Sequence, residues 1–154
     1  MTTLLQFSRN INKIGSRIEN NSLELVKRTS KRALRSLVKG TPVKSGKARS
    51  NWRVSLGNPT STVIDPFSPA KDSDISETAN ANATIAAGIS KINQLRVGKA
   101  RGTGQAGSAV FIANSVPYLD ELRKGSSDQQ PNDWVKAALL EASEEIKATR
   151  LLRR

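Results

Sequence analysis

Cysteine and histidine are both absent from this 154-residue sequence, and each absence removes a class of chemistry. Without cysteine there is no disulfide and no thiolate nucleophile, and without histidine the usual general base near neutral pH is missing. The two residues are also the main protein ligands of zinc, copper and haem iron. We therefore expect a protein that is not an enzyme, with no catalytic residue, no metal and no cofactor.

Aromatic residues and long apolar runs are also scarce. Aromatic side chains make up 4% of the chain and apolar residues 36%, which predicts one domain, residues 1–154, with a mostly aliphatic core. No run approaches the roughly 18 apolar residues that a membrane helix needs. Arg9, Asn10 and Lys13 interrupt the apolar residues at the N-terminus, so a signal peptide is not expected either. These features favour a protein made and used in a cytoplasm, without a membrane partner.

Acidic residues are scarce in the first third of the chain. The net charge is +12, and residues 1–53 hold 13 Lys or Arg against only Glu19 and Glu24, an excess of 11. An asymmetry of this size suggests that a polyanion or an acidic protein lies against this part of the molecule.

Residues 2–39 predict a long basic N-terminal helix, with a possible break at Asn20-Asn21. Apolar residues from Leu4 to Leu37 recur three or four positions apart, which is the period of an amphipathic helix. The opposite face carries six cations, which either form an ordinary solvated face or meet a partner. They are Lys27, Arg28, Lys31, Arg32, Arg35 and Lys39. Gly40-Thr41-Pro42 should end the helix, with Gly40 in a left-handed conformation.

The rest of the chain predicts alternating strands and helices. Residues 52–56 alternate in polarity as a strand does, residues 61–67 could form a second short strand, and residues 109–115 form a third. A middle helix should start at Asp74 and stop before Gly98, and a closing helix should follow Pro131, with Asp133 in its first turn. Trp134, Ala138, Leu139, Ala142 and Ile146 should line the buried face of this closing helix. Between the last two elements, residues 98–108 form a glycine-rich basic loop, and residues 117–125 form a turn and a short helix.

This order predicts an α+β fold. We expect a long N-terminal helix, a small and mostly antiparallel β-sheet, a middle helix, and a C-terminal helix packed on the sheet.

Three local patterns suggest chemistry that their context does not support. "GTGQAG" (102–107) matches the dinucleotide fingerprint, but that fingerprint requires a strand before it and a helix after it, and here the order is reversed. Glu145 and Lys147 have the spacing of a nuclease motif but lie on a predicted helix. Trp52 and Trp134 could stack on bases, although both occupy apolar positions that favour packing in a core or subunit interface.

Two segments resemble a family of small neck and tail-completion proteins of long-tailed bacteriophages, the minor tail protein Z-like, head–tail joining group. "TPVKSGKARSNWRVS" (41–55) is similar to the family's first signature, and "VFIANSVPYLDELRKGSSDQQPNDWVKAAL" (110–139) to its second. The matching residues are Thr41, Pro42, Gly46, Asn51, Trp52, Asn114, Pro117, Tyr118, Gly125, Ser127, Gln130, Pro131 and Val135.

The resemblance implies a structural virion protein. Its copies would form a homo-oligomeric ring, six to match the tail, between the head-proximal connector and the tail tube, assembled in the host bacterium's cytoplasm. DNA would pass through the ring, and the basic face would meet either this DNA or an acidic neighbouring ring. The alternative is a sequence-independent DNA-binding protein that uses the basic N-terminal helix.

In this interpretation residues 41–46 form a corner between helix and strand, and Trp52 anchors the strand. Basic residues beyond the first helix extend the DNA-facing or partner-facing surface. They are Lys44, Lys47, Arg49 and Arg53, which we expect to form an exposed rim, together with Lys99 and Arg101 in the glycine-rich loop.

Overall fold

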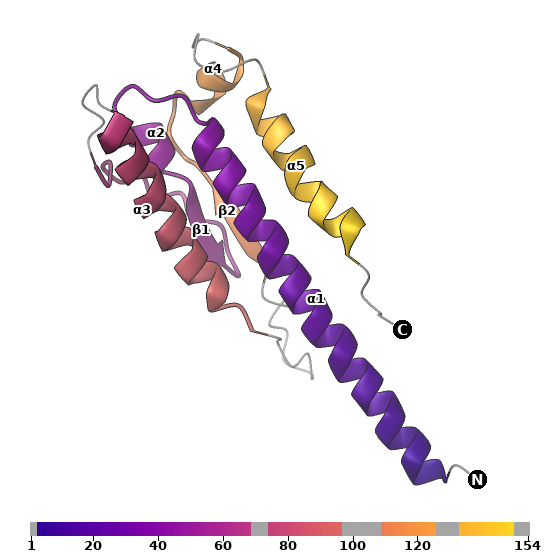
Figure 1. The fold of residues 1–154 in the computed structure, drawn as a ribbon. Helices are drawn as coiled ribbons and strands as arrows, with labels where there is room; N and C mark the ends of the chain where they lie inside the picture. Colours follow the sequence, from indigo (N-terminus) through magenta and orange to yellow (C-terminus); the bar gives the residue numbers. More distant parts are fainter. Residues whose placement is uncertain (1–2, 69–73, 97–108, 126–132, 150–154) are drawn as a thin grey trace.

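The computed structural model describes residues 3–68, 74–96, 109–125 and 133–149 (Figure 1). Five helices and two strands lie in these ranges, and their order confirms the predicted α+β fold. They are α1 (Leu4–Gly40), α2 (Lys47–Ser50), β1 (Arg53–Leu56), α3 (Asp74–Asn93), β2 (Val110–Ala113), α4 (Leu119–Arg123) and α5 (Trp134–Ala148).

Helix α1 is the central element of the fold. It starts at a capping box, in which the Thr3 hydroxyl accepts from the Gln6 amide while the Gln6 side chain accepts from the Thr3 amide. It runs through Asn20-Asn21 without the break that we considered possible. Its second half packs between α5 on one side and α3 with the sheet on the other, whereas its first half extends beyond the rest of the molecule (Figure 1).

Strands β1 and β2 form a two-stranded antiparallel sheet in which Arg53 lies opposite Ala113 and Leu56 opposite Val110. The sheet is small, so most of the core comes from the helices that meet around it. Leu34 and Val38 of α1, Ile92 of α3 and the two tryptophans form the buried cluster. Helix α5 packs mainly along α1, and α1 in turn contacts the sheet.

The predicted C-terminal cap of α1 is wrong in its detail. The helix does end at Gly40, but Gly40 keeps a helical backbone, and the residues with positive φ in the described ranges are Gly46, Gly57, Asp133 and Gly125. A Cβ at Gly40 would lie 3.2 Å from Cε3 of Trp134. The glycine therefore allows the close approach of α5 to α1 and does not serve as a left-handed cap.

The predicted strand at residues 61–67 is not formed, and the closing helix buries less than expected. Trp134, Ala138 and Ala142 are buried against α1, but Leu139 and Ile146 are 53% and 52% exposed. Asp133 precedes the first turn of α5 as its N-cap residue and makes no side-chain cap there. Among the described helices, none combines the length and hydropathy that a membrane span requires.

Candidate functional site

The corner between α1 and β1 is held by one threonine. The Thr41 hydroxyl donates to the Leu37 carbonyl oxygen at 2.6 Å and accepts from Nε1 of Trp52 at 2.7 Å. Both Thr41 and Trp52 are buried, so these bonds replace water for groups that cannot reach it. The two residues that the sequence assigned to the corner and to the anchor therefore contact each other directly.

Arg49 is mostly covered by the corner, and its assignment to an exposed rim is wrong. Its guanidinium donates to the carbonyl oxygens of Thr41 (3.0 Å) and Glu77 (3.3 Å), and its side chain is only 12% exposed. Burial lowers the pKa of Arg49, and the nearby carboxylate of Glu77, at 4.0 Å, partly offsets this shift. Arg49 therefore ties the corner to α3 and is not available to a polyanion.

Asn51 explains why residues 61–67 are not a strand. Its side chain donates to the Ile64 carbonyl oxygen (2.8 Å) and accepts from the Ile64 amide (2.7 Å), so it takes both backbone groups that a neighbouring strand would use. It also donates to the Lys47 carbonyl oxygen at 2.7 Å. One side chain thus fixes this segment against the corner in an extended path.

The second motif segment meets the first at the same corner. Nδ2 of Asn114, which follows β2, donates to the Ala48 carbonyl oxygen at 2.8 Å, across 66 residues of sequence. Its Oδ1 accepts from the Val116 amide at 3.2 Å, which turns the chain into the Pro117-Tyr118 bend before α4.

The remaining matched residues have separate positions. Gly125 takes a left-handed backbone (φ 88°) after α4, Tyr118 is partly exposed, and Val135 packs against the core cluster. Ser127, Gln130 and Pro131 lie outside the described residues.

A buried polar network on α3 was missed by the sequence analysis. Nδ2 of Asn80 donates to Oγ of Ser50 and to the Ser68 carbonyl oxygen, each at 2.8 Å, and Asn80 is fully buried. Gly46, in a left-handed conformation (φ 76°), lies against this amide, because a Cβ there would be 2.8 Å from Nδ2 of Asn80. A signal existed in the sequence. Asn80 and Thr84 are polar and four apart on the buried side of α3, a pattern typical of internal hydrogen bonds.

The basic face of α1 separates into two rows in the structure. The paired row, Arg28 and Arg32, faces the acidic residues of α5. Arg28 lies 3.6 Å from Glu145, and Arg32 lies 3.4 Å from Glu145 and 3.5 Å from Glu141. The scarcity of acids in the first third of the sequence does not leave the paired row without partners, because its partners come from the far end of the sequence.

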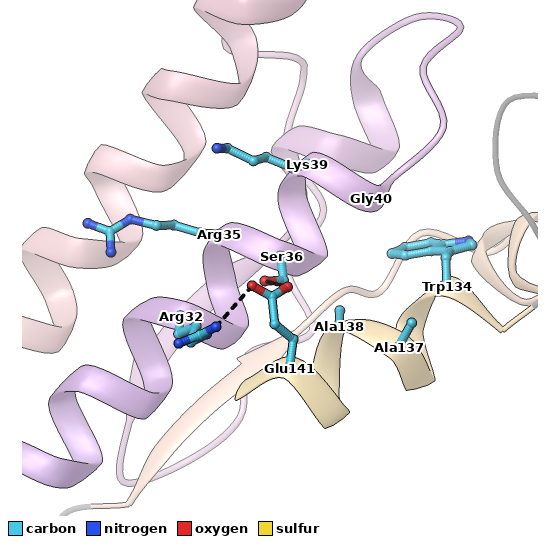
Figure 2. Close-up of a pocket in the computed structure, with 9 residues that line it drawn as sticks. All are labelled: Arg32, Arg35, Ser36, Lys39, Gly40, Trp134, Ala137, Ala138 and Glu141. Atoms are coloured by element: carbon cyan, nitrogen blue, oxygen red, sulfur yellow. Dashed lines mark hydrogen bonds and ion pairs between the residues drawn. The ribbon is translucent and has the colours of Figure 1, made fainter. Parts of the chain in front are cut away.

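The free row consists of Lys31, Arg35 and Lys39, spaced four residues apart along α1. Within the described part of the chain, none of their side chains has a hydrogen bond or ion pair, and Arg35 and Lys39 are exposed. Figure 2 shows Arg35 and Lys39 extending from α1 away from Glu141, while Arg32 reaches toward it. Cations four apart repel each other and slightly weaken a helix, so the row adds charge at some cost in helix stability.

A shallow groove of about 430 Å³ lies between α1 and α5 next to these rows (Figure 2). Its lining is apolar at one end and charged at the other. The lining residues are Arg32, Arg35, Ser36, Lys39, Gly40, Trp134, Ala137, Ala138 and Glu141. Oγ of Ser36 donates to Glu141 at 2.7 Å, so this carboxylate is held by both Ser36 and Arg32.

The other predicted basic residues are dispersed. Lys27 pairs with Glu24 at 3.4 Å within α1. Lys44 is exposed in the segment after α1, while Lys47 and Arg53 are half-buried near the corner. Lys99 and Arg101, like the "GTGQAG" segment, lie outside the described residues. The structure thus brings together Lys31, Arg35 and Lys39 along α1.

The residues that could have suggested catalysis or base stacking have structural roles here. Glu145, on α5, forms ion pairs with Arg28 and Arg32 of α1. The described ranges contain no cluster of three or more potential metal ligands among His, Cys, Asp and Glu. Trp52 and Trp134 are buried and pack edge to face, with ring centroids 6.2 Å apart. Neither ring offers a free face for a base, so the packing interpretation of both is confirmed.

Taken together, the corner joins α1 to the sheet and to α3, and the free row, with Arg35 and Lys39 exposed and Lys31 half-buried, has no partner among the described residues. Such a row can attract phosphates or carboxylates by charge, and contacts to phosphates carry no sequence information. Comparisons with protein-family models, with curated proteins and with solved structures found no match to this chain.

Proposed function

We propose that this chain is a structural virion protein of a long-tailed phage, whose copies form a ring at the head–tail neck. The observation that carries the proposal is the meeting of the two motif segments, in which Asn114 of the second segment bonds to Ala48 of the first at 2.8 Å. The two segments resemble two signatures of one family, and their contact supports the resemblance because both segments help to build one structural unit. Thr41, Gly46, Asn51, Trp52 and Asn114 all belong to this corner.

In the proposed ring the free row lies toward the passage or toward an adjoining ring. Lys31, Arg35 and Lys39 span eight residues, or about 12 Å of helix. DNA would meet these cations through its phosphates, without sequence preference and with a strong dependence on salt. The partners are copies of the chain, the connector and tail-tube proteins, and non-specifically bound DNA.

Electron microscopy of the purified protein, alone and mixed with phage tail tubes, tests the proposal. We expect closed rings, or rings that form only on one end of the tube. Particles that stay monomeric and never dock on tubes or connectors would refute it.

The alternative, a sequence-independent DNA-binding protein, is favoured by the same free row. A charge-neutralising variant tests it against a control that removes equal charge elsewhere. The test variant is Lys31→Gln/Arg35→Gln/Lys39→Gln, and the control is Lys91→Gln/Lys124→Gln/Lys136→Gln.

The alternative predicts duplex binding at micromolar or lower Kd in physiological salt, without ring formation. It also predicts that the test variant lowers the slope of log Kd against log salt by about two to three, since each lost phosphate contact contributes about 0.9 to this slope. The control variant should keep the wild-type slope. Rings on tail tubes combined with weak DNA binding would instead favour the neck protein.

A further inference from the structure

The first half of α1 carries an apolar stripe that nothing in the described molecule covers. Leu4, Phe7, Ile11, Ile14 and Ile18 are large apolar side chains that are between 38% and 91% exposed, and Leu5, beside the stripe, is 62% exposed. Figure 1 shows why, because residues 4–21 extend past the end of α5 and of the sheet. Exposed apolar side chains that are contiguous mark an interaction surface.

The spacing of the stripe identifies the kind of surface. The intervals between these five residues are three, four, three and four, which are the a and d positions of a heptad repeat. A strict a/d stripe is narrow and fits the seam between two helices, whereas a helix that lies on a lipid surface needs a broader apolar face. Isoleucine fills both a and d positions at Ile11, Ile14 and Ile18, as apolar residues do in the seams of coiled coils.

Gly15 provides an independent observation on the same segment. Glycine weakens a helix interior more than any residue except proline, so it usually has a reason to be there. Gly40 and Gly88, the other glycines within described helices, are closed in by Trp134 and Leu34, but a Cβ at Gly15 would meet nothing within 4 Å. Gly15 is the neighbour of Ile14 at the edge of the stripe. The space that it leaves is therefore space for a second helix.

The charges on the segment are compatible with a copy of itself. The positions that flank the stripe hold Ser8, Asn10, Gly15 and Arg17, of which only Arg17 is charged. Arg9 and Lys13 lie on the sides of the helix away from the stripe. No like charges would meet across a seam between two copies.

We propose that residues 4–18 of α1 pack against the same segment of a second copy of this chain, with Gly15 as the point of close approach. The seam spans about 21 Å. It is a property of the isolated protein and does not depend on the proposed neck function, so failure to dock on tail tubes would not affect it.

The test uses Gly15→Ala, because the proposal predicts that this substitution stabilises the helix but weakens self-association. Alanine should raise helicity in circular dichroism, yet it should weaken self-association in analytical ultracentrifugation by about tenfold or more. Ser16→Ala, on the outer side of the same turn, is the matched control and should raise helicity without changing association. Gly15→Ala protein that associates as tightly as wild type, or wild-type protein that stays monomeric at 100 µM or above, would overturn the proposal.

A cysteine cross-link gives a second measurement, since the chain has no cysteine of its own. Residue 11 is the midpoint of the stripe, so it faces its own counterpart whether the two helices run parallel or antiparallel. Under mild oxidation Ile11→Cys should form a disulfide-linked dimer at least fivefold faster than Arg9→Cys on the outer side. Equal rates would overturn the seam, and so would binding of monomeric wild-type protein to phosphatidylglycerol vesicles through this segment.

Discussion

At the scale of single residues, side chains in this fold hydrogen-bond to backbone groups that strand pairing would satisfy in a larger sheet. Asn51 satisfies both backbone groups of Ile64, and Asn114 satisfies the carbonyl of Ala48. Thr41 joins the end of α1 to the indole of Trp52. The described residues contain two short strands, so the chain between the helices depends on these side-chain bonds for its path.

We predict that Thr41→Val destabilises the fold by about 1–3 kcal/mol. The substitution keeps the shape of the side chain but leaves the buried Trp52 Nε1 without its acceptor, and the cost is that of an unsatisfied buried donor. Urea denaturation measures it as a lower midpoint with an unchanged slope. Thr62→Val, at an exposed site whose hydroxyl contact is 3.4 Å long, is the control and should change the free energy of unfolding by less than about 0.5 kcal/mol. Equal midpoints for the two variants would contradict the role given to Thr41.

The sequence predicted which residues make the corner but not what each one does there. Thr41, Gly46 and Trp52 were identified because turn residues and an alternating strand are local patterns. Arg49 was placed on an exposed rim because one of its acceptors, the carbonyl of Glu77, comes near it only when α3 packs on the corner. Gly40 was assigned to a cap for the same reason, since its neighbour Trp134 is distant in sequence.

At the scale of elements, the helices pack closely wherever a small residue permits it. Gly88 on α3 faces Leu34 of α1 and Val54 of β1, and a Cβ there would lie 2.4 Å from Cδ2 of Leu34 and 2.9 Å from Cγ2 of Val54. Leu34 is fully buried and Val54 is stiff because it is β-branched, so neither can move aside easily.

Gly88→Ala should therefore destabilise the protein even though alanine is the better helix former. Helix propensity alone predicts a gain of about 1 kcal/mol, while overpacking of a buried contact costs about 1–3 kcal/mol or more. We expect a net loss of up to about 2 kcal/mol in thermal or urea unfolding. Ser90→Ala, exposed on the same helix, should be neutral or slightly stabilising. A gain in stability for Gly88→Ala would show that α3 can shift away from α1.

Periodicity predicted α1, α3 and α5 well because each is a run long enough to identify, whereas the four-residue α2 was not predicted. The short strand expected at residues 61–67 is not formed, because the Asn51 side chain takes the backbone groups of Ile64. Periodicity also could not tell that the apolar stripe of α1 continues past the body of the protein. Burial of a stripe depends on where the other helices end, and α5 reaches only the second half of α1 (Figure 1).

At the scale of the whole molecule, the net charge of +12 cannot be located by counting along the sequence, because the fold pairs some cations of α1 with acids of α5. Counting acids along the chain suggested that the basic face of α1 has no partners. Glu145 nevertheless neutralises part of it, from 113 residues away, by pairing with Arg32. The cations of the free row stay unpaired among the described residues, whereas the carboxylates of α5 neutralise those of the paired row.

Removing the two carboxylates should therefore increase the affinity for polyanions. Glu141→Gln/Glu145→Gln raises the net charge from +12 to +14 and frees Arg28 and Arg32 beside the free row. Glu19→Gln/Glu121→Gln makes the same change in net charge at sites outside the groove and serves as the control.

We expect the groove variant to bind a fluorescein-labelled duplex about three- to tenfold more tightly than the control, as measured by anisotropy at 50 mM salt. The difference should shrink at 300 mM salt, because the contacts are electrostatic. The free energy of unfolding should fall by less than about 1 kcal/mol, since exposed ion pairs contribute little. Equal affinity of the two variants would mean that only overall charge matters, and that the polyanion does not approach along the α1–α5 side of the molecule.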